Sequence, residues 1–131
     1  MSKINLNPTV SRIPINILID KKETLKGELI RHLSPLTVSH ILKQLPLFGS
    51  IHYNSDNFCY IQTQLNIGTE KQKKIYSQGD ITLMTSTGFI CFILKEIITS
   101  FPMNHIGKIS SANMDLLRDL KPTDTLKIIL V

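Results

Sequence analysis

The hydrophobic positions are most concentrated between residues 78 and 95. Here the Gly79-Asp80 turn leads into a strand from Ile81, and the polar turn Ser86-Thr87-Gly88 leads into an apolar run from Phe89 to Leu94. A short run that is rich in β-branched and aromatic residues and bounded by turns is typical of a strand buried on both faces. We therefore expect a central hairpin, with the rest of the chain packed around it.

Both ends of the chain alternate between apolar and polar residues, which is the period of a strand with one buried face. The apolar set near the start is Ile13, Ile15, Ile17 and Ile19, and the set at the end is Leu126, Ile128 and Leu130. After a polar turn the alternation continues through Leu25, Gly27 and Leu29, which predicts an opening hairpin. Pro14 cannot donate a backbone hydrogen bond, so it belongs at a strand start or on a sheet edge.

Two segments have the spacing of amphipathic helices. In the first, Ser34 is the expected N-cap, Pro35 the first helical residue and Pro46 the stop. Its apolar face consists of Val38, Ile41, Leu42 and Leu45. The second helix is expected after Ser111 and ends at Pro122. Its apolar face consists of Met114, Leu117 and Leu120.

The middle of the chain predicts further strands at 50–53, 58–64 and 105–109, with a turn at 54–57 and the longest loop at 65–77. The end of the second of these strands could extend to Ile67. About eight strands with short connections and two helices predict a mainly β protein, a closed or nearly closed antiparallel barrel capped by the helices. We expect a weakly ordered lead-in at 1–12 and one domain at 13–131.

Charge and composition narrow the classes of partner. The net charge is +5, and the densest basic cluster, Lys71, Lys73 and Lys74, lies in a polar stretch with no aromatic RNA-binding pattern. A solvated loop explains that cluster better than a phosphate-binding surface, so no specific nucleic-acid partner is expected. No apolar run approaches the roughly 20 residues of a membrane span, and the start does not resemble a secretion signal. We therefore expect a cytoplasmic protein without a membrane partner.

The candidate chemical groups do not form a recognisable catalytic or metal motif. Cys59 and Cys91 lie inside apolar runs, where a buried thiol acts as a small hydrophobe. The four histidines form no HxH or HExxH pair, and neither cysteine has a CxxC partner, so no metal site is predicted. Asp80 follows a glycine in a turn, where a carboxylate usually accepts hydrogen bonds from nearby backbone amides. Without a phosphate loop or a nucleophile elbow, no cofactor is predicted.

Four stretches together resemble the small cyclophilin-like domain family of bacteria and archaea. They are Leu45-Pro46, the Gly79-Asp80 turn with the strand around Cys91, the Asn104–Ile109 segment, and the helix-strand pair from Asp115 to Ile128. The Asn-x-Ile-Gly-Lys-Ile pattern is the most specific of the four. The resemblance covers about Ile13 to Val131 and implies a minimal cyclophilin-like β-barrel, which carries a fold and a cavity rather than a reaction.

The chain departs from that family at two places. A Trp-Gly pair is replaced by Asn54-Ser55, and a Trp-Pro-Pro segment is replaced by Met84-Thr85-Ser86, which implies a differently shaped pocket. Full-length cyclophilins catalyse prolyl isomerisation and carry an arginine in a Phe-His-Arg segment, whereas Ile51-His52-Tyr53 is the nearest analogue here. Because Arg12, Arg31 and Arg118 are expected outside the cavity, no cation is expected near a bound prolyl amide.

These observations predict a cyclophilin-like barrel that binds a peptide or a small apolar ligand without catalysis. The candidate ligand-binding residues are Tyr53, Tyr60, Met84, Phe92 and Asn104, although the sequence favours plain core packing for each. Two alternatives stay open, namely a weak peptidyl-prolyl isomerase and an accessory nucleic-acid binder acting through the loop at Lys71 to Lys74. The identity of the ligand and the oligomeric state are not predicted.

Overall fold

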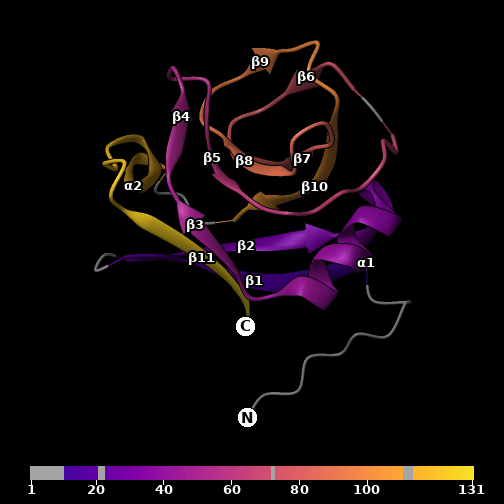
Figure 1. Ribbon diagram of the computed structural model, residues 1–131, viewed down its shortest axis with the longest axis horizontal. Coiled ribbons are helices and arrows are strands. Elements are labelled where there is room, and N and C mark those ends of the chain that lie inside the picture. Colours follow the sequence, from indigo (N-terminus) through magenta and orange to yellow (C-terminus); the bar gives the residue numbers. More distant parts are fainter. Residues whose placement is uncertain (1–10, 21–22, 72, 111–113) are drawn as a thin grey trace.

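A computed structural model describes residues 11–20, 23–71, 73–110 and 114–131, and its strands curve around a common interior (Figure 1). The elements, in chain order, are β1 (Arg12–Ile19), β2 (Thr24–Ile30), the 3-10 helix η1 (Arg31–Leu33), α1 (Pro35–Gln44), β3 (Leu47–Ser50), β4 (His52–Asn54), β5 (Phe58–Gln62), β6 (Ile75–Tyr76), β7 (Asp80–Met84), β8 (Phe89–Ile93), β9 (Ile97–Ile98), β10 (Met103–Ile109), α2 (Asp115–Arg118) and β11 (Thr125–Leu130). Arg12, which was assigned to the lead-in, is the first residue of β1, and residues 1–10 lie outside the described ones.

The main sheet of the described residues is antiparallel, with nine strands in the order β3-β11-β1-β2-β10-β7-β8-β5-β4. Its two edge strands, β3 and β4, follow each other in the chain and are separated only by Ile51. The chain itself therefore bridges the two edges, and the sheet is a nearly closed barrel, as predicted. Where the sequence predicted one strand at 50–53 there are two, because β3 pairs with β11 while β4 pairs with β5.

The interior is filled mainly by aliphatic side chains, and the predicted registers are confirmed. In β1 the four alternating isoleucines are buried, and Ile17 lies opposite both Leu25 of β2 and Ile128 of β11. Pro14, which was expected at a strand start or on a sheet edge, is the third residue of β1; it lies opposite Glu28 of β2, one residue before the first β1–β11 pair at Ile15 and Leu130. This inner cluster also contains Ile61, Ile90, Phe92 and Ile106.

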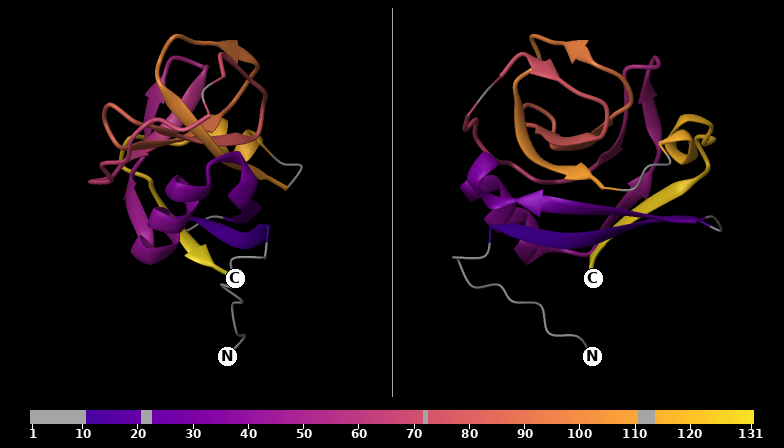
Figure 2. Two further views of the ribbon diagram at one scale, coloured as in Figure 1. Left: turned by 90° about the vertical axis from the view of Figure 1, so that its right-hand side faces the viewer. Right: turned by 180° about the vertical axis from the view of Figure 1, so that it is seen from behind.

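The hairpin β7–β8 is buried on both faces, as predicted. Its inner face carries Ile90 and Phe92, while Cys91 and Ile93 belong to a second cluster on the outer face. The short ribbon of β6 and β9 lies on the side of β7 and β8 that faces away from β1 and β2 (Figures 1 and 2). Tyr76 of this ribbon is fully buried in the outer cluster, together with Cys91 and Ile93 of β8. The ribbon therefore covers the outer face of the hairpin, which explains why both faces of β8 are apolar.

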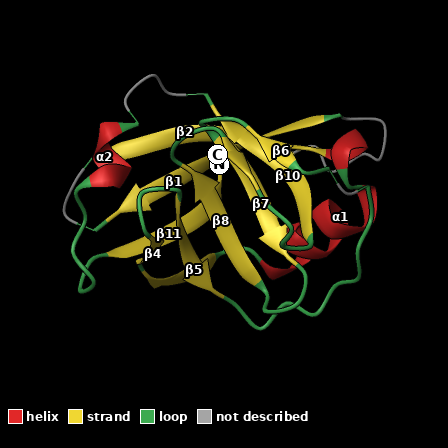
Figure 3. Cartoon of the chain, turned by 90° about the horizontal axis from the view of Figure 1, so that it is seen from above, coloured by secondary structure: helices red, strands yellow, loops and turns green. Residues whose placement is uncertain are grey.

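The two helices lie at opposite ends of the barrel (Figure 3). As predicted, α1 has Ser34 at its N-cap position and Pro35 as its first residue, and it ends before Pro46. The Ser34 hydroxyl donates to the His105 carbonyl of β10 at 2.8 Å instead of capping the helix. The second helix has only four residues; its predicted apolar residues Met114, Leu117 and Leu120 are buried, and its predicted cap Ser111 lies outside the described residues. No helix in the described ranges is long and apolar enough to cross a membrane.

Candidate functional site

The structure separates the five residues that the sequence singled out. Phe92 is fully buried in the inner cluster and Met84 is buried in the outer cluster, so both pack against other side chains. Tyr60 is half-buried on the outer face of β5, where its ring stacks between His52 of β4 and Phe89 of β8, with ring centroids at 5.3 and 4.4 Å. These three rings extend the outer cluster toward the edge strand β4.

Tyr53 lies at the end of the barrel that carries α2. Its hydroxyl donates to the Leu117 carbonyl and accepts the Leu120 amide at 3.0 Å, which fixes the chain around α2, and burial raises the pKa of the phenol. Tyr53 lines a cavity of about 430 Å³, which we call the α2-end cavity; its other lining residues are Ser55, Asp56, Leu94, Lys95, Arg118 and Leu120. The sequence placed Arg118 outside the expected ligand cavity, on the polar side of the second helix; in the structure Arg118 and Tyr53 line the same cavity. The turn after α2 brings the two residues to the same opening.

Asn104 is fully buried and holds the loop that precedes β6. Its amide nitrogen donates to the Thr37 hydroxyl and the Gly68 carbonyl, both at 2.9 Å, and its oxygen accepts the Glu70 amide at 2.8 Å. The Glu70 carboxylate in turn accepts the Leu36 and Thr37 amides at 3.1 and 2.7 Å, where the first turn of α1 has unpaired N–H groups. We call Asn104, Glu70 and Thr37 the loop clasp.

The surroundings of Glu70 in the loop clasp favour the ionised form of its carboxyl group. Burial opposes ionisation of Glu70, but its hydrogen bonds with the Thr37 hydroxyl and the two amides outweigh that effect and hold the pKa of the carboxyl below its usual value. The positive end of the α1 dipole acts in the same direction. The next residue, Lys71, donates to the His32 carbonyl at 2.8 Å, and Lys73 lies over the Tyr76 ring at 5.2 Å. Two of the three clustered lysines thus contact the protein itself.

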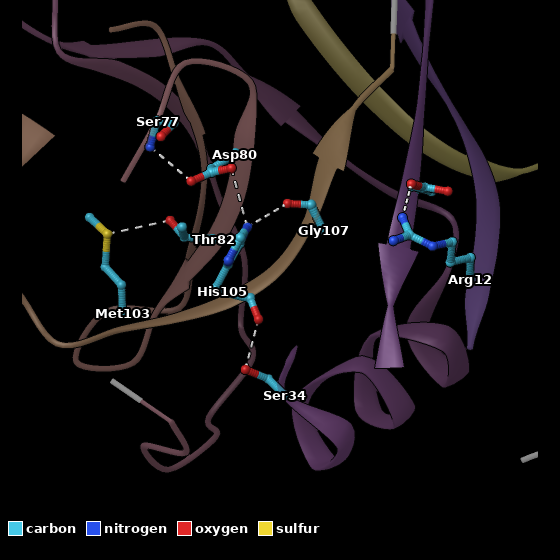
Figure 4. A network of polar contacts seen from close by, with 9 residues as sticks. Arg12, Ser34, Ser77, Asp80, Thr82, Met103, His105 and Gly107 are labelled. Carbon is cyan, nitrogen blue, oxygen red and sulfur yellow. Dashed lines mark hydrogen bonds and ion pairs between the residues drawn. The ribbon is translucent and has the colours of Figure 1, made fainter. Parts of the chain in front are cut away.

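His105 and Asp80 form the centre of a polar network between β10 and β7 (Figure 4). The His105 Nε2 donates to the Gly107 carbonyl at 2.9 Å, across a break in the β10–β7 register, and lies 3.4 Å from the Asp80 carboxylate. Asp80 also accepts the Ser77 amide at 2.8 Å, as its position in a turn predicted. Burial raises the pKa of Asp80, but the contacts with His105 and Ser77 have the larger, opposite effect and hold the pKa below its usual value. The contact between His105 and Asp80 therefore joins β10 to β7 where the register of the two strands shifts.

The two cysteines are packing residues of the hydrophobic clusters. Cys59 and Cys91 are free and buried, as predicted, and burial raises the pKa of each thiol to about 12, which suppresses the reactive thiolate. Among the described residues, no three His, Cys, Asp or Glu side chains come close enough together to hold a metal ion.

A second cavity, of about 540 Å³, lies at the seam of the barrel, where β3 and the continuation of β5 run apart. At Gly49 the two strands touch, because a Cβ there would lie 3.4 Å from the Ile61 Cβ. From Gly49 back toward Leu47, β3 stays paired with β11. The chain that follows β5 separates from β3 over the same stretch and leaves the opening between them. We call this opening the seam groove; it is lined by His40, Gln44, Pro46, Leu47, Phe48, Gln62, Thr63, Gln64, Leu65, Asn66 and Ile67.

One wall of the groove is the seam segment, residues 63–67, which keeps the pattern of a strand beyond the end of β5. Thr63 and Leu65 are half-buried and Ile67 is buried, whereas Gln64 and Asn66 are exposed. Within the described ranges, none of these five residues makes a backbone-to-backbone hydrogen bond. The seam segment therefore keeps the burial alternation of a strand, and no backbone hydrogen bond pairs it with a described strand.

The seam segment turns one defined edge toward the groove. The Thr63 hydroxyl donates to the Gly88 carbonyl at 2.5 Å, and a Cβ on Gly88, which has a positive φ of 78°, would lie 2.6 Å from the Leu65 carbonyl oxygen. The backbone polar groups of Leu65 therefore face the β7–β8 turn. The Leu65 amide also donates to the Thr63 hydroxyl at 3.1 Å. Because successive residues of a strand point their backbone groups to opposite edges, we expect those of Gln64 and Asn66 to face away from that turn, toward the groove that both residues line.

The lining of the groove is uncharged apart from one imidazole. None of its eleven residues is Lys, Arg, Asp or Glu, and four carry carboxamides: Gln44, Gln62, Gln64 and Asn66. Leu47, Leu65 and Ile67 provide apolar surface, and Phe48 is 69% exposed beside them. Carboxamides both donate and accept hydrogen bonds, as peptide groups do.

The comparisons with known proteins agree with this architecture. A family model described as the Cyclophilin-like family matches residues 27–128, which is most of the chain. The chain belongs to this family. Among solved structures, it is similar to a hypothetical protein from Archaeoglobus fulgidus determined in solution, with a TM-score of 0.77, 18% identity, and coverage of 96% of this chain and 100% of that chain. At this identity the likeness shows the fold alone. No match was found among curated proteins.

Within this Cyclophilin-like fold, the sequence interpretation missed the seam groove. The signal was present, since Cys59, Ile61, Thr63, Leu65 and Ile67 alternate with polar or half-exposed residues without interruption. The alternation of apolar positions extends to Ile67, but strand pairing with β8 ends at Gln62 and Phe89. Periodicity predicts which face of a strand is buried, but it does not predict whether the edge of the strand is hydrogen-bonded to another strand.

Proposed function

We propose that this Cyclophilin-like protein binds an extended, uncharged stretch of polypeptide in the seam groove. The observation that carries the proposal is the seam segment, whose Gln64 and Asn66 line the groove and make no backbone-to-backbone hydrogen bond with a described residue. An extended peptide supplies the alternating N–H and C=O groups that such an edge lacks. This is recognition by strand addition, in which main-chain hydrogen bonds give affinity and side-chain pockets give selectivity.

The chemistry of the lining selects the kind of peptide. Apolar side chains on one face of the peptide would pack on Leu47, Leu65 and Phe48, and the carboxamides would pair with its main chain. A charged side chain directed into the groove would lose water without gaining an ionic partner, which disfavours charged segments. With a rise of about 3.3 Å per residue, a peptide of roughly five residues would span the seam segment.

The experiment is a titration of ¹⁵N-labelled protein with the capped peptide acetyl-Thr-Val-Thr-Val-Thr-amide, followed by amide chemical shifts. The proposal predicts the largest changes at Gln64, Asn66 and Phe48. The same peptide methylated on the nitrogens of its alternate residues, along one edge and then along the other, is the control for main-chain recognition. One of the two methylated peptides should fail to bind, since strand addition uses only one edge of the guest.

A matched pair of protein variants distinguishes binding in the groove from nonspecific binding to exposed aromatic side chains. Phe48→Ala should weaken the peptide about tenfold, equivalent to about 1.4 kcal/mol. Phe101→Ala removes another exposed phenylalanine, 47% exposed and outside the groove lining, and should leave the affinity unchanged. Equal binding by both methylated peptides, or equal loss in both variants, would contradict strand addition at the seam.

A further inference from the structure

The α2-end cavity is a second opening, independent of the seam groove. It shares no lining residue with the groove and lies by α2, whereas the groove is bounded by residues of α1, at the other end of the barrel (Figure 3). Its volume of about 430 Å³ falls in the range of roughly 300 to 1,000 Å³ that is typical of small-molecule sites. It is therefore large enough for a small molecule.

The cavity has an apolar interior. Leu94 and Leu120 are 2% and 7% exposed. Tyr53 adds its ring, and because its hydroxyl is already bonded to the backbone at Leu117 and Leu120, the ring offers mainly carbon surface to a ligand. The apolar part of a ligand would replace water over these three side chains.

Two cations stand at the same opening, and Arg118 is held in place by the protein. Its guanidinium donates to the Leu94 carbonyl at 2.6 Å and to the Gln78 side chain at 3.1 Å. The position of the charge beside the apolar interior is therefore fixed by the backbone of the residue that forms part of that interior. Lys95, the next residue along, contributes the second cation.

The carboxylates that neutralise these cations are held weakly. Arg118 pairs with Asp115 at 2.8 Å and Lys95 pairs with Asp56 at 3.0 Å, but the side chains of Asp115 and Asp56 are 81% and 76% exposed. Ion pairs this exposed contribute little, because water solvates both partners well. A carboxylate attached to an apolar group that is itself bound in the cavity would be delivered beside Arg118 and could displace them.

From this arrangement we propose that the α2-end cavity binds a small organic acid, with its hydrocarbon part against Leu94, Leu120 and Tyr53 and its carboxylate on Arg118. Lys95 supports the same charge from the rim. This site does not depend on the function proposed for the seam groove, and either could fail without the other.

The test uses octanoate and octan-1-ol, which share a hydrocarbon chain and differ in charge. Octanoate should shift the amide signals of Leu94, Lys95 and Leu120 in the full-length protein and bind at least tenfold more tightly than octan-1-ol. Arg118→Met, which keeps the length of the side chain and removes its charge, should reduce octanoate affinity about tenfold and leave octan-1-ol unchanged. Arg12→Met, which removes an exposed arginine paired with Glu28 on β2, is the matched control and should have no effect.

A second variant acts in the opposite direction. Asp115→Asn removes the exposed competitor of the ligand carboxylate and should strengthen octanoate binding about twofold. It also keeps the proposal testable if Arg118→Met fails to fold. Equal affinity for octanoate and octan-1-ol, signal changes confined to the seam groove, or octanoate binding that is insensitive to both variants would overturn the proposal.

Discussion

β1 and the seam segment have the same alternation of apolar and polar residues, but their edges differ. β1 is hydrogen-bonded to β2 on one side and to β11 on the other, whereas the seam segment has the Gly88 turn on one side and the seam groove on the other. The inward residues of β1 are all isoleucine and fully buried, while those of the seam segment include the half-buried Thr63 and Leu65. A strand pattern thus identifies the buried face, and only the three-dimensional structure shows whether the edge is satisfied.

The seam segment is nevertheless held in position without strand pairing. At its start Thr63 is bonded to the Gly88 carbonyl, and just after its end the loop clasp binds the Gly68 carbonyl and the Glu70 amide. Fixing both ends reduces the conformational entropy that a bound peptide would have to remove. The four predictions that follow concern the paired strands against the seam segment, two residues of the loop clasp, and catalysis.

The largest contrast is expected from placing a charge on each side of the comparison. Ile17→Asp and Ile128→Asp should each unfold or aggregate the protein, because an unpaired carboxylate in the inner cluster costs more than about 4 kcal/mol. Leu65→Asp should cost only about 1 kcal/mol, since its side chain can turn toward the open groove. Urea denaturation measures all three. Cooperative unfolding of the two isoleucine variants near the wild-type midpoint would show that the assigned register is wrong.

The second prediction concerns the buried residue of the loop clasp. Asn104→Ala should lower the free energy of unfolding by about 2 to 4 kcal/mol, because it removes three hydrogen bonds and leaves the Glu70 amide and the Gly68 carbonyl without their partner. Asn66→Ala, at an exposed position of the seam segment, should change it by less than about 0.5 kcal/mol. Similar losses in the two variants would mean that the clasp does not anchor the loop.

Some features of the fold could be predicted from the sequence, and others could not. The registers of β1 and β11 follow from strict alternation of strong β-formers, and the central hairpin follows from its turns, so each could be read locally. The split of 47–54 into β3 and β4 could not, because it depends on pairing with β11 and β5, which are far away along the chain. Asn104 was selected as a polar residue at a strand end, but its partners Thr37 and Glu70 come from other elements. For the same reason the sequence did not show that Arg118 lies beside Tyr53.

The third prediction uses the charge of Glu70. Glu70→Gln should cost about 1 kcal/mol at neutral pH, since the carboxylate accepts hydrogen bonds at the first turn of α1. The pKa of Glu70 is lowered on folding, so its contribution is complete above the ordinary value of 4.5 and disappears as the pH falls from there through the folded pKa. The difference between wild type and variant should therefore vanish in acid. Glu23→Gln, at an exposed carboxylate, provides the baseline, and a gap that persists in acid would argue against an ionic clasp.

The smallest expected effect is on catalysis. Arg118 is at the opening that Tyr53 lines, but its guanidinium is bonded to Asp115, Gln78 and Leu94, and an uncharged prolyl amide does not compete for it with the Asp115 carboxylate as a ligand carboxylate would. The Tyr53 hydroxyl donates to a backbone carbonyl. Acceleration of prolyl isomerisation requires a donor that binds the twisted amide more strongly than the planar one. We expect no rate above background for X-Pro peptides in a protease-coupled assay at micromolar protein, and none after Tyr53→Arg. Turnover that is lost in Arg118→Met would favour the isomerase alternative.

The central claim is that the seam segment is a strand whose free edge accepts a partner, and amide hydrogen exchange tests it most directly. In the free protein the amides of Gln64 and Asn66 should exchange rapidly, while the hydrogen-bonded amides of β1 should exchange slowly. On saturation with acetyl-Thr-Val-Thr-Val-Thr-amide, Gln64 and Asn66 should become protected by at least tenfold, with no comparable change in β1. Protection of Gln64 and Asn66 already in the free protein, or bound peptide that leaves them exchanging rapidly, would contradict the claim.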